Sequence, residues 1–540
     1  MNSWAGYAWL QEHLNVSATQ KMPIRSQIGR GRKTSFQDGV CYEIYRPNSK
    51  PDDTPLAHLA FALKHEGIHL ELLSHTFKSF DKQALTDWIA SEPTGQYTRK
   101  AGFLYEWLTG DTLTVPGVSG NYHNLLNPHE VIVADTPIKN SRWRINDNLP
   151  GTPYFCPIIR RTELLDIASD YDSSARLQNM EDDYGTDLMS RSAVWLTIRE
   201  SRASFAIEHE GDQKSKIHRF ALAMGRYCGQ IDTPLSSASL TELQNSILGT
   251  STIRAGLRQS PVFVGSGTQE TGTYVHYVAP DANDVKPMLE GLQAFMTKAR
   301  NASPIVRAAV ASFGFVFIHP MADGNGRISR FLINDTLRRD SAVPEPLLLP
   351  ISSTITKSTA SRNRYDKILE AYSRPMMAET AHNIRFGDRT NYPDGVVSDF
   401  EFSGNDTLRP AWRYPDLTEQ SEYLFHVIHE TIEYEMRHQI ESHQSYIDAR
   451  DKVKDTLEGP NEHIDRIMRS IERNEGQISN TLAKEFPMLK DPEISEPIKD
   501  VINAYVANRP VRQNYDPNAE VEALQSKTGT GTPETDWGQI

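Results

Sequence analysis

One stretch near the middle of the chain holds several groups that could act together on a nucleotide polyphosphate. A histidine can take up a proton near neutral pH, an aspartate suits Mg²⁺, and glycines let the backbone approach an anion closely. Two arginines three positions apart would share a helix face from which both could reach phosphate oxygens. Together these groups predict the attack of a hydroxyl on a nucleotide phosphorus. The stretch reads His319-Pro320-Met321-Ala322-Asp323-Gly324-Asn325-Gly326-Arg327-Ile328-Ser329-Arg330.

The sequence also predicts the elements that would hold this stretch. Pro320 disfavours helix at His319, so we expect a loop over residues 319–325 and a helix that starts near Gly326. The N-terminus of such a helix carries unpaired N–H groups and a partial positive charge, which favour a bound anion. Residues 262–278 hold two β-prone runs around a polar, glycine-bearing turn, which predicts a β-hairpin.

Helical spacing of apolar residues recurs through much of the rest, so the fold should be mainly α. We expect one helix over residues 56–77, dense helices from residue 190, and further helices from 424 to about 506. Residues 393–415 look like a linker between them. At ~150 residues per domain, the 540 residues predict about three domains.

Composition excludes several classes of protein. The net charge of −13 argues against broad binding to nucleic acid or to anionic membranes. The three cysteines are widely spaced, without a metal-binding or disulfide pattern, and favour a reducing cytoplasm. No stretch approaches the ~20 apolar residues of a membrane-spanning helix.

The stretch at 319–330 resembles the signature of the Fic family, HPFxDGNGRxxR, and departs from it only at Met321, where phenylalanine is usual. Members of that family mostly transfer AMP from ATP to a Ser, Thr or Tyr hydroxyl of a target protein. The resemblance implies ATP as substrate and Mg²⁺ as cofactor, and the GNGR form separates this chain from the phosphate-transferring Doc variant. It leaves open whether another nucleotide moiety, such as UMP, is transferred.

By the same resemblance, each residue of the stretch takes a role. His319 is the general base, Asp323 is the Mg²⁺ ligand, and Tyr365 matches a family tyrosine near the adenine pocket. The anion hole and the phosphate-binding arginines are then Gly324, Asn325, Gly326, Arg327 and Arg330.

The resemblance also implies an architecture and partners. A helical Fic core with a β-hairpin flap would be flanked by an N-terminal α+β region and a C-terminal helical domain. The flap at 262–278 would dock an unknown target protein, and self-modification and a homodimer are both compatible with the family. The expected boundaries are 1–185 for the N-terminal Fic-associated domain, 186–390 for the core with an inhibitory helix near 195–211, 391–510 for the C-terminal domain, and 511–540 for a disordered polar tail.

Ser204 to His209 resembles the family's inhibitory motif, [ST]xxxE[GN]. It implies that Glu208, placed four residues after Ser204, pairs with Arg330 and removes that arginine from the γ-phosphate of ATP. The same glutamate could instead align water for removal of AMP. His209 stands where glycine or asparagine is usual. Glu210 also precedes a glycine, but no serine or threonine lies four residues before it, so we expect it to matter little.

Two other classes of function remain as alternatives. Residues His65 to His69 spell HExxH, which on one helix would place two histidines on a shared face as in zinc metalloproteases, with Glu92 as a third ligand by spacing. Against this, Gly67 costs a helix interior roughly 1 kcal/mol. A helix-turn-helix-like arrangement around 462–486 would instead make the chain a non-catalytic, DNA-binding regulator, although that region is acidic.

Overall fold

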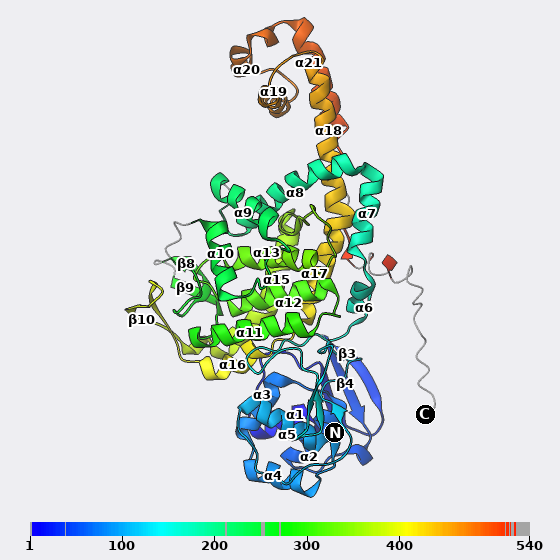
Figure 1. Cartoon of the computed structure of the whole chain (residues 1–540), viewed down its shortest axis with the longest axis vertical. Coiled ribbons are helices and arrows are strands. Elements are labelled where there is room, and N and C mark those ends of the chain that lie inside the picture. The colour runs from blue at the N-terminus through cyan, green and yellow to red at the C-terminus, as the bar shows by residue number, and fades with distance from the viewer. Residues whose placement is uncertain are drawn as a thin grey trace. The chain divides into compact units, whose positions relative to one another are not determined.

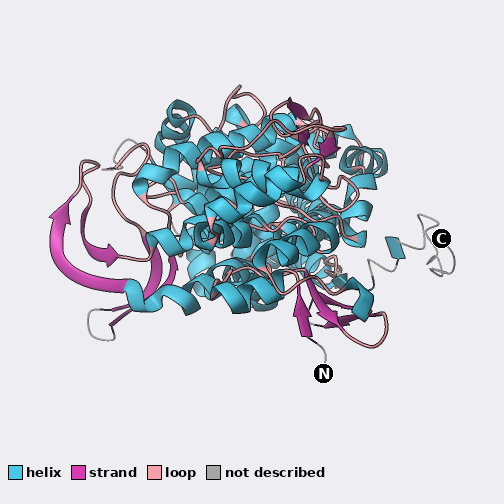
Figure 2. Ribbon diagram, turned by 90° about the horizontal axis from the view of Figure 1, so that it is seen from below, coloured by secondary structure: helices cyan, strands magenta, loops and turns pink. Residues whose placement is uncertain are grey.

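The computed structural model describes residues 3–37, 39–210, 213–249, 254–268, 272–512, 515–517, 519 and 523–524. The chain divides into two compact units. The first comprises residues 1–171, 204–340 and 355–425, and the second comprises 172–203, 341–354 and 426–540. Helices dominate, and the strands form small separate sheets (Figures 1 and 2). The expected mainly α fold is therefore confirmed.

The N-terminal part of the first unit packs helices against a small mixed sheet of order β1-β2-β4-β3, in which β2 and β4 are parallel. Its core buries Leu59, Leu72, Leu104 and Trp143. A second small sheet, of order β5-β7-β6, follows. The elements are β1 (Ser3–Ala5), α1 (Tyr7–Leu14), β2 (Ile24–Ile28), β3 (Lys33–Gln37), β4 (Val40–Tyr45), η1 (Pro47–Ser49), α2 (Pro55–His65), α3 (Leu70–Ser79), α4 (Lys82–Ser91), α5 (Gln96–Thr109), β5 (His123–Asn124), β6 (Ile138–Asn140) and β7 (Ile145–Asp147).

The single helix expected over 56–77 is wrong, because Gly67 breaks it. Gly67 has φ +79, a left-handed conformation that ends α2, and the His69 side chain then caps α3 by accepting the N–H of Leu72. The HExxH residues therefore do not share a helix face. Glu66 is buried and accepts the N–H of Tyr7 at 2.7 Å. Within the described residues, no group of three or more His, Cys, Asp or Glu side chains could hold a metal ion, which removes the support for a zinc protease.

The rest of the first unit is a helical layer built around α12 and α13, which pack against each other. α12 is apolar on every side because its neighbours α6, α11 and α13 surround it. Figure 1 shows α11, α12 and α13 in green. The elements are α6 (Glu163–Asp170), α9 (Lys214–Tyr227), α10 (Ser237–Leu248), β8 (Phe263–Thr268), β9 (Gly272–Val278), α11 (Ala282–Lys298), α12 (Pro304–Ile318), α13 (Asn325–Arg339), α15 (Thr359–Thr380), η2 (Ala381–Asn383), β10 (Ile384–Asn391), β11 (Val397–Phe402), α16 (Asn405–Arg413) and α17 (Thr418–Glu430).

Two hairpins belong to this unit. β8 and β9 form the antiparallel hairpin that the sequence predicts, although its turn at 269–271 lies outside the described residues. The linker expected over 393–415 is wrong, because β10 and β11 form a second hairpin and α16 follows it. There the proline and glycine make a tight turn, in which Gly395 has φ +79 and the Asp394 carboxylate accepts the N–H of Val396.

The second unit is helical. Its C-terminal cluster buries Val453, Ile464, Ile467 and Ile498. Helices lie on both sides of a turn in the 462–486 region, but α20 spans only six residues, which is short for a DNA-recognition helix. The tail expected at 511–540 falls mostly outside the described residues. The elements are α7 (Ser173–Tyr184), most of α8 (Thr186–Ile207), α14 (Ile351–Ile355), η3 (Thr431–Met436), α18 (Arg437–Lys454), α19 (Asn461–Arg473), α20 (Asn480–Glu485), η4 (Pro487–Lys490) and α21 (Pro492–Ala507).

Among the helices that the structure describes, none combines the length and the apolar character needed to cross a bilayer.

Candidate active site

His319 ends helix α12 in a left-handed conformation. Its φ is +50, and its N–H still donates to the carbonyl of Phe315 at 2.9 Å. Pro320 cannot continue the helix, so the chain turns into a loop and re-enters helix at Asn325, one residue before the predicted start. The loop therefore places the predicted base next to the N-terminus of α13.

The imidazole of His319 is set up to accept a proton at Nε2. Its Nδ1 lies 3.2 Å from the carbonyl oxygen of Val316, which can only accept, so Nδ1 carries the hydrogen. Burial, and to a lesser degree the positive charge of Arg258, lowers the pKa of His319 to about 4. The ring is therefore neutral at physiological pH, which is the form that a general base needs.

The two glycines of the loop are needed for different reasons. Gly324 caps α13 with φ +89, a conformation that other residues adopt only with strain. Gly326 is needed because of a close approach: a Cβ there would lie 2.3 Å from Oε1 of Glu208. A carboxylate thus already lies against the N-terminus of α13, the kind of place that binds anions.

Asn325 supports the loop with its side chain and does not project it toward an anion. Its Oδ1 accepts the N–H of Met321 at 2.9 Å, and its Nδ2 donates to the Met321 carbonyl at 2.8 Å. Met321 is fully buried, so methionine fills the apolar site under the loop where phenylalanine is usual in the Fic signature. Only the backbone of Asn325 is placed to contribute to an anion hole.

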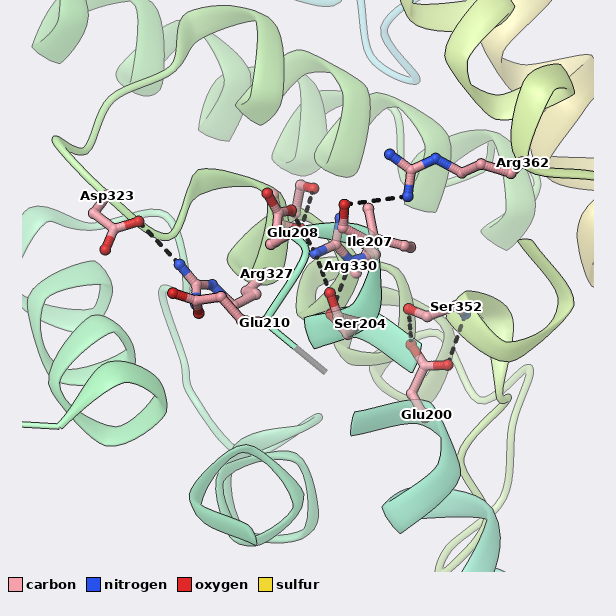
Figure 3. A network of polar contacts seen from close by, with 12 residues as sticks. Glu200, Ser204, Ile207, Glu208, Glu210, Asp323, Arg327, Arg330, Ser352 and Arg362 are labelled. Carbon is pink, nitrogen blue, oxygen red and sulfur yellow. Dashed lines mark hydrogen bonds and ion pairs between the residues drawn. The ribbon is translucent and has the colours of Figure 1, made fainter. Parts of the chain in front are cut away.

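Arg330 is held by two residues of the segment that resembles the inhibitory motif (Figure 3). Its Nε donates to Oγ of Ser204 at 2.8 Å, and its Nη2 donates to the Ser204 carbonyl at 3.0 Å and to Oε1 of Glu208 at 2.8 Å. The arginine side chain is only 2% exposed. All hydrogen bonds of this group are charge-assisted, which makes them stronger than neutral ones.

The electrostatics keep Glu208 ionised. Burial, the largest single effect, would raise the pKa of this carboxyl, but the charge and hydrogen bond of Arg330, together with the charges of Arg327 and Arg362, outweigh it. The net result is a pKa below the usual value, so Glu208 is a carboxylate at neutral pH. Arg362 also donates to the carbonyl of Ile207 at 3.2 Å and so caps the last turn of α8.

His209 takes the position that gives the turn after α8 its shape. Its φ is +59; its N–H donates to the Ala206 carbonyl, and the N–H of Glu210 donates to the Phe205 carbonyl. This pair of bonds is the Schellman arrangement that ends many helices, with its left-handed residue usually glycine. The Gly or Asn of the inhibitory motif therefore matches a conformational requirement, which His209 meets with strain.

Glu210, which was expected to matter little, contacts the other arginine of the motif. Oε2 of Glu210 lies 2.6 Å from Nη1 of Arg327, whose Nη2 also lies 2.9 Å from Oδ1 of Asp323. Figure 3 shows Arg327 between the two carboxylates. Both arginines of the motif are thus paired with carboxylates of the same turn. The sequence does contain a second glutamate before a glycine, Glu210-Gly211, but the contact of its side chain with Arg327 depends on the folded turn.

The two remaining predicted residues, Asp323 and Tyr365, each lie beside an arginine of this region. Asp323 is 61% exposed, so its carboxylate is accessible to a metal ion. Tyr365 on α15 is buried with its ring near the guanidinium of Arg362, and burial raises the pKa of its hydroxyl. The predicted site residues are therefore brought together in one region of the first unit.

Part of the chain is similar to proteins of one known family. Residues 234–337 match the model of the Fic/DOC family. The chain is similar to the protein adenylyltransferase fic-1 of Caenorhabditis briggsae, with 33% identity over 121 residues, which is 22% of each chain. It is similar to the protein adenylyltransferase Fic of Drosophila virilis, with 31% identity over 115 residues, which is 21% of each chain. This chain thus spans about a fifth of the length of these relatives.

Among solved structures, a Fic family protein from Desulfovibrio desulfuricans G20 aligns with 18% identity and a TM-score of 0.33, over 70% of this chain and 98% of that one. The family match covers α10, the β8–β9 hairpin, α11, α12, the candidate catalytic loop at 319–324 and most of α13. The similarity of this chain to the Fic/DOC family is thus carried by residues 234–337.

Proposed function

We propose that this protein transfers AMP from ATP to a hydroxyl of a target protein, and that its own inhibitory turn restrains the reaction. The observation that carries the proposal is the position of a neutral His319 beside the N-terminus of α13, where Arg330 and Arg327 also converge. The relatives named protein adenylyltransferase support the choice of AMP.

The proposed step is an in-line displacement at the α-phosphorus of ATP. The target hydroxyl oxygen forms a bond to that phosphorus, the bond between it and the bridging oxygen of the β-phosphate breaks, and pyrophosphate leaves. Nε2 of His319 takes the hydroxyl proton. The backbone N–H groups at the start of α13 and the side chains of Arg327 and Arg330 hold the phosphate charge.

The residues present fit a magnesium ion. The chain offers one exposed carboxylate, Asp323, directly before the anion-binding N-terminus of α13, and Mg²⁺ in nucleotide sites is commonly held by one or two carboxylates together with the phosphates. When bound, the ion would neutralise the phosphate charge. Arg327 already contacts Asp323 and would help to orient that carboxylate.

The restraint follows from the position of Glu208. Its carboxylate contacts Arg330 and lies against Gly326, so it competes with nucleotide phosphate for both the guanidinium and the helix N-terminus. A hydrogen bond to a charged group is worth about 1.5–3 kcal/mol, so loss of the carboxylate should raise the rate by about tenfold to a hundredfold.

The target would dock in extended form along the β8–β9 hairpin. Tyr274 and Val264 are exposed there, and main-chain pairing with an exposed strand is a common way to bind an unstructured segment. A segment of a second copy of this chain could bind in the same way, which would give self-modification.

The test is intact-mass analysis of the purified Glu208→Gly protein after incubation with Mg²⁺ and each of ATP, UTP, GTP and CTP in turn. We expect a mass increase equal to AMP with ATP, and none when His319 is also changed to alanine. An increase only with UTP would reassign the transferred group. No increase with any nucleotide, on the protein itself or on a cell extract supplied as target, would refute the proposed function.

A further inference from the structure

Arg258 is a buried cation whose hydrogen-bond partners are carbonyl groups around the catalytic loop. The residue is 2% exposed. Its Nε donates to the carbonyl of His319 at 2.7 Å, its Nη1 to that of Ser260 at 3.0 Å, and its Nη2 to that of Pro280 at 2.5 Å. Since α12 ends at this point, the carbonyls of its last turn lack helical partners, and Arg258 supplies one.

The main chain around Arg258 is joined to the same loop. The N–H of Arg258 donates to the Pro320 carbonyl at 2.9 Å, and Leu257 forms a β-bridge with Met321. At the outer end of the segment, the Asp394 carboxylate accepts the N–H of Gln259 at 2.7 Å. The segment 257–260, which we call the brace, is thus fixed to the loop on one side and to the second hairpin on the other.

His319 needs such support because its conformation is strained. A residue other than glycine in the left-handed region costs roughly 1–2 kcal/mol and persists only where its surroundings fix it. The histidine carbonyl that Arg258 holds belongs to the residue that must direct Nε2 at the attacking hydroxyl. Misplacement of a reacting group by about 1 Å can cost roughly a hundredfold in rate.

We propose that Arg258 is a positioning residue for His319, which fixes the direction of the imidazole through the His319 carbonyl. This inference rests on the proposed function. Lysine cannot replace the arginine, because one ammonium cannot span the separate carbonyls that the planar guanidinium reaches. The buried arginine stays protonated, since burial lowers its pKa only to about 10.

The test uses the full chain carrying Glu208→Gly, in which AMP incorporation into the protein itself is followed at varied ATP. We expect Arg258→Lys to lower the rate at saturating ATP by about tenfold to a hundredfold and to leave the half-saturating ATP concentration within about threefold. A matched control is Arg307→Lys. Arg307 is also a buried arginine that donates to carbonyls, those of Met296 and Ala299, but it lies near the opposite end of α12. Arg307→Lys should lower the melting temperature and leave the rate at saturating ATP within about twofold of that of the Glu208→Gly parent.

A second comparison separates positioning from general damage to the fold. If Arg258 acts through His319, then Arg258→Lys should have no further effect on the residual rate of the His319→Ala protein, because coupled residues are not additive. An equal loss in both backgrounds, or full activity of Arg258→Lys with His319 present, would overturn the inference. If Arg258→Lys does not fold, Asp394→Ala provides a second variant, because it removes the carboxylate that joins the brace to the second hairpin. Asp394→Ala should lower the rate of AMP incorporation severalfold, and an unchanged rate would overturn the inference. Absence of transfer in the Glu208→Gly parent would instead refute the proposed function.

Discussion

Glu208 and Arg330 form an ion pair of 2.8 Å that lies directly against the N-terminus of α13. A second pair, Glu210 with Arg327 at 2.6 Å, lies beside it. Both glutamates belong to the turn that ends α8, and both arginines belong to the motif that would bind phosphate. One turn thus supplies the countercharge for both arginines of the motif.

Glu210→Gln should raise AMP incorporation in an otherwise unchanged chain by about tenfold, because it removes the charge that holds Arg327. The rate of label transfer from α-labelled ATP measures this. Glu242→Gln, which changes a glutamate that contacts Tyr227 on the surface, is the control and should have no effect. If Glu210→Gln is as slow as the parent chain, Arg327 is not restrained by this pair.

His209→Gly should strengthen the restraint, because glycine adopts the left-handed turn without the roughly 1 kcal/mol of strain that histidine carries. We expect background incorporation to fall about fivefold. His209→Val should do the opposite, since a β-branched residue fits this conformation poorly. Neither change should matter when Glu208 is already glycine. A large effect in that background would place the role of His209 outside the inhibitory turn.

The pH dependence should reflect the low pKa of His319. A base acts only when unprotonated, and a pKa of about 4 keeps the ring neutral well below the usual histidine value of 6.5. With Glu208→Gly, excess Mg²⁺ and ATP below saturation, the rate should therefore be nearly flat between about pH 6 and pH 8. Glu208 itself raises the pKa of His319, so its removal in this variant cannot shift the loss of activity at acid pH to a higher pH. A fall in rate with a midpoint at about pH 6.5, the usual pKa of histidine, would contradict this environment for His319.

Asp323→Asn should raise the Mg²⁺ concentration needed for half-maximal transfer by at least about tenfold, because the amide binds the cation poorly. Titration of Mg²⁺ in the Glu208→Gly chain measures the shift. Asp187→Asn breaks a comparable surface pair, with Arg191, and serves as the control. The same Mg²⁺ dependence in the Glu208→Gly chain with and without Asp323→Asn would exclude Asp323 as the ligand.

The parts of this fold that could be predicted from the sequence are those set by local chemistry. The loop after α12, the helix that starts at Asn325 and the β8–β9 hairpin each follow from proline, glycine and β-prone residues close in sequence. The break at Gly67 was missed, because apolar spacing continues through it while a single positive φ ends the helix. The sequence does not predict the β10–β11 hairpin, because proline and glycine close together are as typical of a linker as of the tight turn that joins these strands.

The contacts of Arg258 and Glu210 could not be predicted from the sequence, because they join residues far apart in the chain. Arg258 lies in no motif, and its partners His319 and Pro280 come from other elements of the fold. Glu210 reaches Arg327 across 117 positions of the chain. Neither pairing leaves a pattern in one sequence, because each depends on how α8, the brace and the catalytic loop meet in space.

The central claim is that Glu208 restrains an AMP transferase whose base is His319. Its most direct test compares label incorporation from α-labelled and γ-labelled ATP by the unchanged chain, by Glu208→Gly and by Glu208→Gly with His319→Ala. We predict that Glu208→Gly incorporates the α-label about tenfold to a hundredfold faster than the unchanged chain and does not incorporate the γ-label, and that the double change lowers the rate by about 10²–10⁴. Equal incorporation by the unchanged chain and Glu208→Gly, or full activity without His319, would contradict the account.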